Sequence, residues 1–355
     1  MFPEGKTLTT FSLADLGWSA AFQSQLALED LETLRPARIA EVQRHRAVAL
    51  TPAGQDSVTF PGDIPAGDIA VGDWVLLETG APRIARCLDR TSEIARRAAG
   101  QGAERQLIAA NVDTLGIVTA ATAEFSLPRL ERYLVLAAGS GAQPLVILTK
   151  ADLADTAPFL DMVHGAARDC PVVAVDAHAP ETAAEIAAWT GRGHTIALVG
   201  SSGVGKTTLT NALTGRSDAT AGLREDDQKG RHTTTFRALR PILGGGWIID
   251  SPGMREVGLV EAGEGIGQVF SDIGDLALGC RYRNCVHDGE PGCAVTAAVQ
   301  AGRLDTDRLE RWRRLVSEDA RASETRAAAR ARNRRFGKLV REATAERKRK
   351  GNWGD

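Results

Sequence analysis

Short apolar runs, each followed by a polar or glycine-containing segment, recur through the middle of the chain. Pro144–Leu148, Pro171–Ala177, Thr195–Val199 and Trp247–Asp250 have the length and apolar content of buried strands. The third run leads into a glycine-rich loop and then into Thr208–Leu213, which has the character of a helix start. Buried strands that alternate with helices predict an α/β domain with polar loops at the carboxyl ends of its strands.

Residues 36–98 show a different pattern, in which short β-rich pieces are separated by glycine and proline. Strands this short and this closely spaced predict a small closed barrel. Glycines at residues 100 and 102 then predict a linker to the next domain. The predicted strands are Arg38–Val42, Arg46–Leu50, Ser57–Phe60, Trp74–Leu77 and Arg83–Leu88.

Residues 200–207 read Gly-Ser-Ser-Gly-Val-Gly-Lys-Thr and match the phosphate-binding pattern G-x-x-x-x-G-K-[ST] at every fixed position. In this phosphate loop, successive backbone N–H groups and the following helix N-terminus attract phosphate oxygens. Lys206 is expected to reach the β- and γ-phosphates, and the Thr207 hydroxyl to bind magnesium. The predicted nucleotide-binding residues here are Gly200, Ser201, Ser202, Gly203, Val204, Gly205, Lys206, Thr207 and Thr208.

Two further segments predict the elements that sense the γ-phosphate. Asp250 to Gly253 form D-x-x-G after an apolar strand, where Asp250 can hold the magnesium shell and Gly253 can donate its N–H to the γ-phosphate. Upstream lies a polar stretch at residues 229–235, of which Thr234 is favoured over Thr235 as a magnesium ligand. The alternative is that these threonines only lead into a strand.

Residues 149–152, Thr-Lys-Ala-Asp, follow an apolar strand and predict a guanine-recognition segment, here called the base loop. Asp152 can accept hydrogen bonds from guanine N1–H and the 2-amino group, which adenine does not offer. Lys150 can lay its stem along the base, and Thr149 stands where asparagine is usual. The predicted base contacts are therefore Thr149, Lys150, Ala151 and Asp152, joined by a backbone N–H near Ala177 on the next strand.

The base loop precedes the phosphate loop, the reverse of the order in ordinary GTPases, so the sequence predicts a circularly permuted GTPase domain. This order, with Gly-Arg-His-Thr-Thr-Thr at 230–235 and Asp-Ser-Pro-Gly at 250–253, resembles the ribosome small-subunit-dependent GTPase A family (RsgA, also YjeQ or YloQ). Ile108–Asp113 resembles that family's strand entering the GTPase domain, and Val71–Val75 its N-terminal barrel. The resemblance implies an OB-fold barrel, binding to the small (30S) subunit and its rRNA, late maturation of that subunit, and release of an assembly factor.

Cys280, Cys285, His287 and Cys293 form C-x4-C-x-H-x5-C, a closed set suited to one structural zinc ion. The alternative, free thiols near a histidine, fits poorly with the polar residues between them, because unliganded cysteines prefer apolar surroundings. A helix from about Thr306 is expected to pack on this segment. Its apolar positions are Leu309, Trp312, Leu315 and Val316.

Charge is uneven along the chain, although the formal net charge is only −2. From Arg321 to Asp355, twelve Lys or Arg residues face four acidic ones. Such a tail predicts contact with a polyanion, or alternatively a solvated end. The predicted organisation is an arm at 1–35 anchored by Phe2, Phe11 and Trp18, a barrel at 36–98, a linker at 99–106, a GTPase domain at 107–268, a mostly helical zinc domain at 269–320 and a basic tail at 321–355.

Cysteine usage and hydropathy bear on location. Five cysteines, an odd number, argue against a disulfide framework, and neither a signal segment nor a bilayer-length apolar run is found. A cytoplasmic protein without a membrane partner is expected, and nothing in the sequence predicts an obligate dimer, so a monomer is expected.

Met254 follows the D-x-x-G segment where many GTPases carry a water-orienting glutamine, which predicts slow hydrolysis without a partner. Arg231 and His232 are internal alternatives for that role. Two other functions stay open: a GTPase that acts on another RNA such as tRNA, and a nucleic-acid-binding protein whose GTP site serves only as a clamp.

Overall fold

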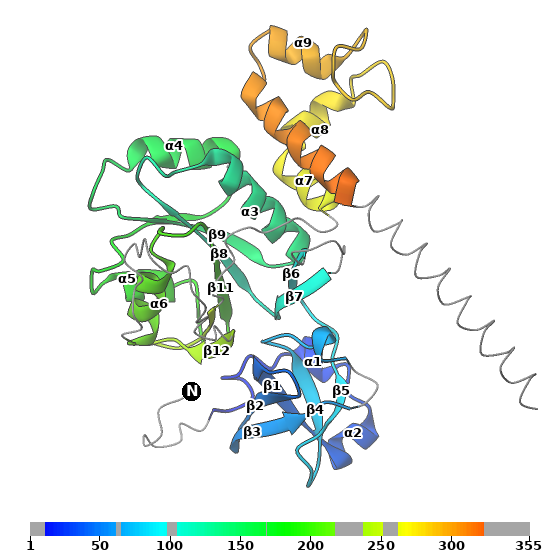
Figure 1. Cartoon of the computed structure of the whole chain (residues 1–355), viewed down its shortest axis with the longest axis vertical. Coiled ribbons are helices and arrows are strands. Elements are labelled where there is room, and N and C mark those ends of the chain that lie inside the picture. The colour runs from blue at the N-terminus through cyan, green and yellow to red at the C-terminus, as the bar shows by residue number, and fades with distance from the viewer. Residues whose placement is uncertain are drawn as a thin grey trace, which may run out of the picture.

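The structure is a computed structural model that describes residues 11–61, 65–97, 105–167, 169–216, 237–250 and 262–322. Figure 1 shows small antiparallel strands at one end, a sheet covered by helices in the middle, and a group of helices at the other end. The predictions at Phe2, Arg231, His232, Thr234, Gly253 and Met254, and those for residues 323–355, lie outside the described residues.

The central part of the sheet has the order β10-β9-β8-β11-β13-β12. Neighbouring strands are parallel except for the pair β12 and β13, which is antiparallel. Parallel strands covered on both faces are apolar throughout, and every residue of β11 is buried. The strands are β8 (Thr114–Ala120), β9 (Gln143–Thr149), β10 (Val172–Ala174), β11 (Thr195–Val199), β12 (Ala238–Pro241) and β13 (Trp247–Asp250).

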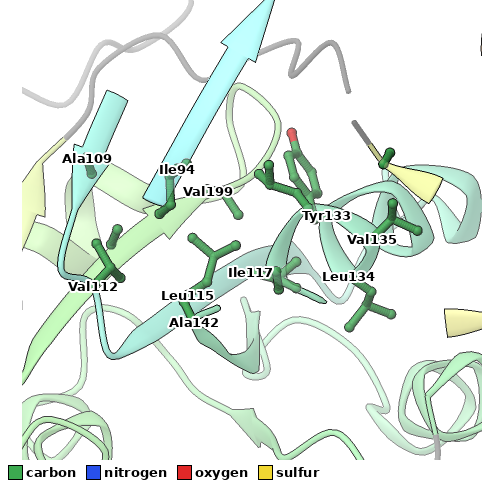
Figure 2. Close-up of a cluster of buried hydrophobic side chains, with 14 of the residues drawn as sticks. Ile94, Ala109, Val112, Leu115, Ile117, Tyr133, Leu134, Val135, Ala142 and Val199 are labelled. Carbon is green, nitrogen blue, oxygen red and sulfur yellow. The ribbon is translucent and has the colours of Figure 1, made fainter. Parts of the chain in front are cut away.

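Helices connect these strands and cover the sheet. The longest is α3 (Leu127–Ser140), which has a proline in its first turn and ends at Gly141 in the left-handed conformation, with φ 80°. Its residues Tyr133, Leu134 and Val135 belong to the same buried cluster as Leu115 and Ile117 of β8 (Figure 2). The others are α4 (Ala157–Ala166), α5 (Thr182–Ala187) and α6 (Lys206–Thr214).

Five antiparallel strands form the N-terminal part. β1 pairs with β2 and β4, β2 pairs with β3, and β4 pairs with β5. A parallel bridge between Thr59 and Arg83 then links the end of β3 to the start of β5, so the pairs form a ring. The strands are β1 (Leu34–Val42), β2 (Arg46–Thr51), β3 (Gly54–Thr59), β4 (Trp74–Glu78) and β5 (Ile84–Cys87), preceded by the short helices α1 (Ala20–Gln23) and α2 (Leu28–Thr33), while the 3-10 helix η1 (Ala66–Asp68) lies between β3 and β4.

A separate two-stranded sheet, β6 (Glu93–Arg97) and β7 (Arg105–Ala110), stands between these parts. The segment Ile108–Asp113, which resembles the family's strand entering the GTPase domain, covers the end of β7 and the turn after it. Residues 108–110 belong to β7, and the strand that enters the sheet is β8, which begins at Thr114. The chain reverses at Asn111, whose φ of 54° is left-handed, and this turn separates the two strands.

The segment 11–35 packs against both the central sheet and the N-terminal strands. The Phe11 ring lies 4.9 Å from Trp247 of β13, and the Trp18 ring 4.8 Å from Trp74 of β4. The Trp247 indole N–H also donates to the carbonyl of Asp15 at 2.6 Å. Two of the three aromatic anchors therefore have the expected contacts, and the third lies in the undescribed residues 1–10.

The C-terminal part is helical, with α7 (Gly263–Val269), α8 (Ser271–Ala277), α9 (Ala294–Gln300) and a further helix over residues 306–322. Leu309 and Leu315 of the last helix are buried, whereas Val316 is 38% exposed and does not join the packed face as expected. Successive residues of a helix lie about 100° apart, so Val316 points away from the side that Leu315 buries. Among the described residues, no helix is long and apolar enough to cross a membrane.

Candidate functional site

The phosphate loop connects β11 to α6, which begins at Lys206. Gly200, Gly203 and Gly205 have φ angles of 149°, 80° and 91°, and a Cβ at Gly200 would lie 2.2 Å from the Val118 carbonyl. Glycine is needed because these conformations and this close approach exclude a side chain. The Lys206 ammonium donates to the carbonyl of Gly200 at 2.8 Å and to that of Ser201.

The base loop begins at the last residue of β9 and contacts the phosphate loop directly. Thr149 is fully buried, and its hydroxyl donates to the Val204 carbonyl at 2.6 Å while lying 3.0 Å from the Thr119 carbonyl. The chain then turns at Lys150, whose φ is 58°, and Asp152 is exposed. The structure therefore brings these two predicted segments together at one edge of the sheet.

The loop after β10 lies against the base loop. The Ala151 N–H donates to the Val175 carbonyl at 3.2 Å, and the Val175 N–H donates to Leu148 at 2.8 Å. The nearby Ala177 side chain is buried. Ala177 thus lies two residues beyond the segment that bonds to the base loop.

Of the expected magnesium-site residues, only part is described. Thr207 is exposed in the first turn of α6, at the open side of the phosphate loop. Asp250 ends β13, whose neighbour in the sheet is β11, so its backbone lies on the strand next to the phosphate loop's own strand.

The Cys/His segment folds around a small centre. One ligand atom from each of Cys280, Cys285, His287 and Cys293 lies within 4.8 Å of the others. His287 Nδ1 is 3.6 Å from Cys280 Sγ and 3.4 Å from Cys293 Sγ, and the two sulfurs are 3.9 Å apart. Three thiols and an imidazole at these separations fit a tetrahedral metal ion.

Neighbouring elements hold this centre in place. His287 has a left-handed φ of 62°, Cys293 is the N-cap of α9, and its sulfur accepts from the Thr296 N–H. The 306–322 helix packs on the same loop, since Trp312 lies 5.4 Å from the His287 ring and Arg313 donates to the His287 carbonyl. This contact agrees with the helix packing expected from the sequence.

Other contacts of the phosphate loop were missed by the sequence reasoning. Arg129 Nη1 lies 3.3 Å from the Ser201 hydroxyl, and the Tyr133 side chain lines the same small hollow as Ser201. Burial raises the pKa of Tyr133. The i, i+4 spacing of Arg129 and Tyr133 was the available signal, because it places both on one face of α3.

A buried ion-pair cluster joins α3 to the C-terminal helices. The Glu131 carboxylate is fully buried and accepts from Arg311 at 2.7 Å and Arg308 at 3.2 Å. Arg308 also bonds to Asp272 of α8, and Arg132 forms a two-pronged pair with Glu318. Burial raises the pKa of Glu131, and the two arginines oppose that effect.

One arginine of the N-terminal strands, Arg38 of β1, is internal. Arg38 is only 2% exposed and donates to the carbonyls of Leu16 and Asn111 and to the Thr195 hydroxyl. Loss of hydration lowers its pKa to about 10. Its sequence neighbours do not reveal this, because burial here requires three distant segments to meet.

The strand order and the two loops define a P-loop GTPase whose chain is circularly permuted. β9, which leads into the base loop, and β11, which leads into the phosphate loop, both lie next to β8 in the sheet. In the chain, however, β9 comes before β11. The RsgA GTPase family model matches residues 87–260. The chain belongs to the RsgA GTPase family, and it is a GTP-hydrolysing enzyme.

Several relatives cover nearly the whole chain. The small ribosomal subunit biogenesis GTPase RsgA of Mesorhizobium japonicum is 47% identical over 321 residues, 89% of this chain and 92% of the relative. The protein of the same name in Streptomyces coelicolor is 42% identical over 332 residues, 90% of each chain. YjeQ from Thermotoga maritima has a similar fold, with a TM-score of 0.59 at 23% identity over 81% of this chain and 99% of that one.

Proposed function

We propose that this GTPase acts on the small ribosomal subunit during its late maturation. The observation that carries the nucleotide site is the hydrogen bond from Thr149 to Val204, because it holds the base loop and the phosphate loop together. The relatives' common name, small ribosomal subunit biogenesis GTPase, supports the small subunit as the partner.

The residue roles follow from the chemistry of each loop. Asp152 selects guanine, with Lys150 along the base and the backbone near Ala177 at the guanine oxygen. Lys206 and the backbone of the phosphate loop hold the β- and γ-phosphates. Thr207, Asp250 and Thr234 complete the magnesium site, and Gly253 contacts the γ-phosphate. Magnesium supplies the positive charge that neutralises the phosphate oxygens.

Zinc is the metal proposed for the Cys/His centre. Three thiolates and one imidazole are soft ligands in a closed set without an open position, which suits a structural zinc ion and not a catalytic one. Zinc would then hold the loop between α8 and α9 from within, in addition to the contacts that Trp312 and Arg313 make with His287.

The N-terminal strands are proposed to be an OB-fold that contacts rRNA. The ring of pairs, closed by the Thr59–Arg83 bridge, supports this fold. The basic residues available on its surface are Arg35, which pairs with Asp56, and Arg46, with Arg44 and His45 in the turn between β1 and β2. The basic residues beyond position 321 are proposed to add electrostatic attraction for RNA.

The division into domains near residues 35, 98, 106, 268 and 320 belongs to the same proposal, as do a monomeric state and action in the cytoplasm. Met254 in place of a water-orienting glutamine supports slow hydrolysis by the isolated enzyme. The subunit is proposed to supply or order the missing group. Only 27 residues separate Gly253 from Cys280 (280 − 253), which supports a link between nucleotide state and the zinc centre.

The decisive experiment is a GTP hydrolysis assay with and without purified small subunits. Strong stimulation by the subunit is expected, and stimulation only by another RNA would instead favour the tRNA-type alternative. If no partner stimulates hydrolysis, the protein acts as a GTP-gated clamp and the proposal is wrong.

Two variants check that the measured rate belongs to the proposed site. Lys206→Ala should abolish hydrolysis, because no other described side chain of the phosphate loop carries a charge to the phosphates. Asp152→Asn should reduce the preference for GTP over ATP, because the amide lacks the second acceptor for guanine. Competition by unlabelled GTP and ATP measures the preference, and an unchanged ratio would contradict the role of Asp152.

A further inference from the structure

Arg129 is a cation at the rim of the phosphate loop that no part of the proposed site uses. It is the third residue of α3, its side chain is exposed, and its Nη1 lies 3.3 Å from the Ser201 hydroxyl. Tyr133, one turn further along, lines the same hollow as Arg129 and Ser201. The first turns of α3 are therefore attached to the loop at Ser201.

Ser201 lies at the end of the phosphate loop that is expected to face the γ-phosphate. Lys206 donates to the carbonyls of Gly200 and Ser201, so its ammonium lies at that end. The lysine of a phosphate loop is the group that reaches the β- and γ-phosphates. Two cations thus converge on Ser201, one from α6 and one from α3.

The charge of Arg129 is not balanced by a carboxylate in the part of the chain that the structure describes. Within the described ranges it forms no ion pair with a carboxylate. By contrast, Arg132 on the next turn is fully engaged with Glu318 at 2.6 Å, and Lys150 lies 3.9 Å from Glu124. A long, exposed side chain without an ionic partner can turn toward a ligand at little cost.

Hydrolysis of GTP is accelerated by a positively charged side chain beside the γ-phosphate. Negative charge in the transition state is spread over the γ-phosphate oxygens and the leaving oxygen, and an arginine supplied within the same chain can stabilise it. Met254, which follows the D-x-x-G segment where many GTPases carry glutamine, has no polar side chain. A guanidinium offers several donors in a fixed plane, which suits two phosphate oxygens at once.

We propose that Arg129 is a catalytic arginine of the GTPase reaction, contacting the γ-phosphate in the transition state. The inference rests on the proposed nucleotide site. Water oxygen forms a bond to the γ-phosphorus, the bond from that phosphorus to the β–γ bridging oxygen breaks, and GDP leaves with the bonding electrons. One proton of the water stays on the oxygen that joins the γ-phosphorus and the other passes to another oxygen of the released phosphate, while Arg129 keeps all its protons and acts only through charge and hydrogen bonds.

The test compares Arg129→Gln with Arg132→Gln, a matched arginine one turn along α3 that faces Glu318. Single-turnover GTP hydrolysis is measured for each variant and for the wild type, with and without small subunits. Arg129→Gln should lower the rate by about 100-fold or more, in line with the loss of a single transition-state donor. Arg132→Gln should keep the rate within about threefold of the wild type. A change this small is well below the loss expected when a transition-state donor is removed.

Binding measurements separate catalysis from structure. Arg129→Gln should weaken binding of GDP with aluminium fluoride and magnesium, a transition-state mimic, far more than binding of GDP or a non-hydrolysable GTP analogue. Equal weakening of all three, or a rate near wild type, would overturn the proposal and leave Arg129 as a support for Ser201. The proposed function fails separately, if the wild type itself is not stimulated by subunits.

Discussion

At the scale of single residues, Thr149 has the most informative position. Its hydroxyl is buried and bonds to Val204 of the phosphate loop, so it joins two loops that are 55 residues apart in the chain. The departure from the usual asparagine therefore preserves a hydrogen-bonding side chain at the contact between the loops. Threonine is shorter than asparagine, but it still reaches the phosphate loop because the backbone of that loop lies close to Thr149. A Cβ placed on Gly205 would lie only 3.6 Å from the Thr149 hydroxyl oxygen.

Thr149→Val should weaken the binding of both GTP and GDP by about tenfold, because an unsatisfied buried acceptor costs about 1–3 kcal/mol. Thr149→Ser keeps the hydroxyl and is the matched control, with affinity expected to stay close to wild type. Titration with a fluorescent guanine nucleotide measures both. Wild-type affinity in the valine variant would show that the bond does not support the site.

At the scale of elements, α3 contacts two different parts of the molecule through two of its faces. One contacts the phosphate loop through Arg129 and Tyr133, and the other holds the C-terminal helices through Glu131 and Arg132. Because the helix is packed on the sheet along its length, it is a rigid connection between the nucleotide site and the metal-binding part.

Glu131→Gln should lower the free energy of unfolding by about 3 kcal/mol, because breaking the buried pair leaves Arg311 without a carboxylate partner and Arg308 with Asp272 alone. Glu318→Gln removes a pair that is about one third exposed and should cost less than about 1 kcal/mol. Urea unfolding of both variants gives the comparison. Equal effects in the two would mean that Glu131 is not a buried anchor.

At the scale of the whole molecule, three parts meet around the GTPase sheet. β12 pairs with β1, so the N-terminal strands continue the central sheet, and Arg38 bonds to segments from the arm, from the turn before β8 and from β11. The C-terminal helices attach on the α3 side (Figure 1). The N-terminal strands and the C-terminal helices are thus each packed against the GTPase domain. A small subunit that binds to either of them would contact a part that is joined directly to the nucleotide-binding domain.

Removal of the metal should affect the C-terminal part first. Treatment with a strong chelator, or a Cys293→Ser variant, should expose residues 278–292 to proteolysis and reduce subunit-stimulated hydrolysis, while basal hydrolysis changes little. The reason is that the four Cys/His side chains lie along this loop and meet at one centre, whereas the nucleotide site is built from the sheet. Zinc content measured by elemental analysis is the control, and a protein without zinc but with full stimulation would contradict the assignment.

The sequence by itself determined the local chemistry: the phosphate loop, the base loop, the Cys/His set and most strand positions could be read from it, because each depends on residues close together in the chain. It did not show that residues 108–110 pair with β6 in a separate two-stranded sheet, since an apolar run does not show which sheet it joins. Only the tertiary structure decided that Thr149 touches Val204, that Arg38 is buried, and that Arg129 faces Ser201. These facts depend on the contacts between segments distant in sequence, and such contacts follow from how strands and helices pack, which no local pattern contains.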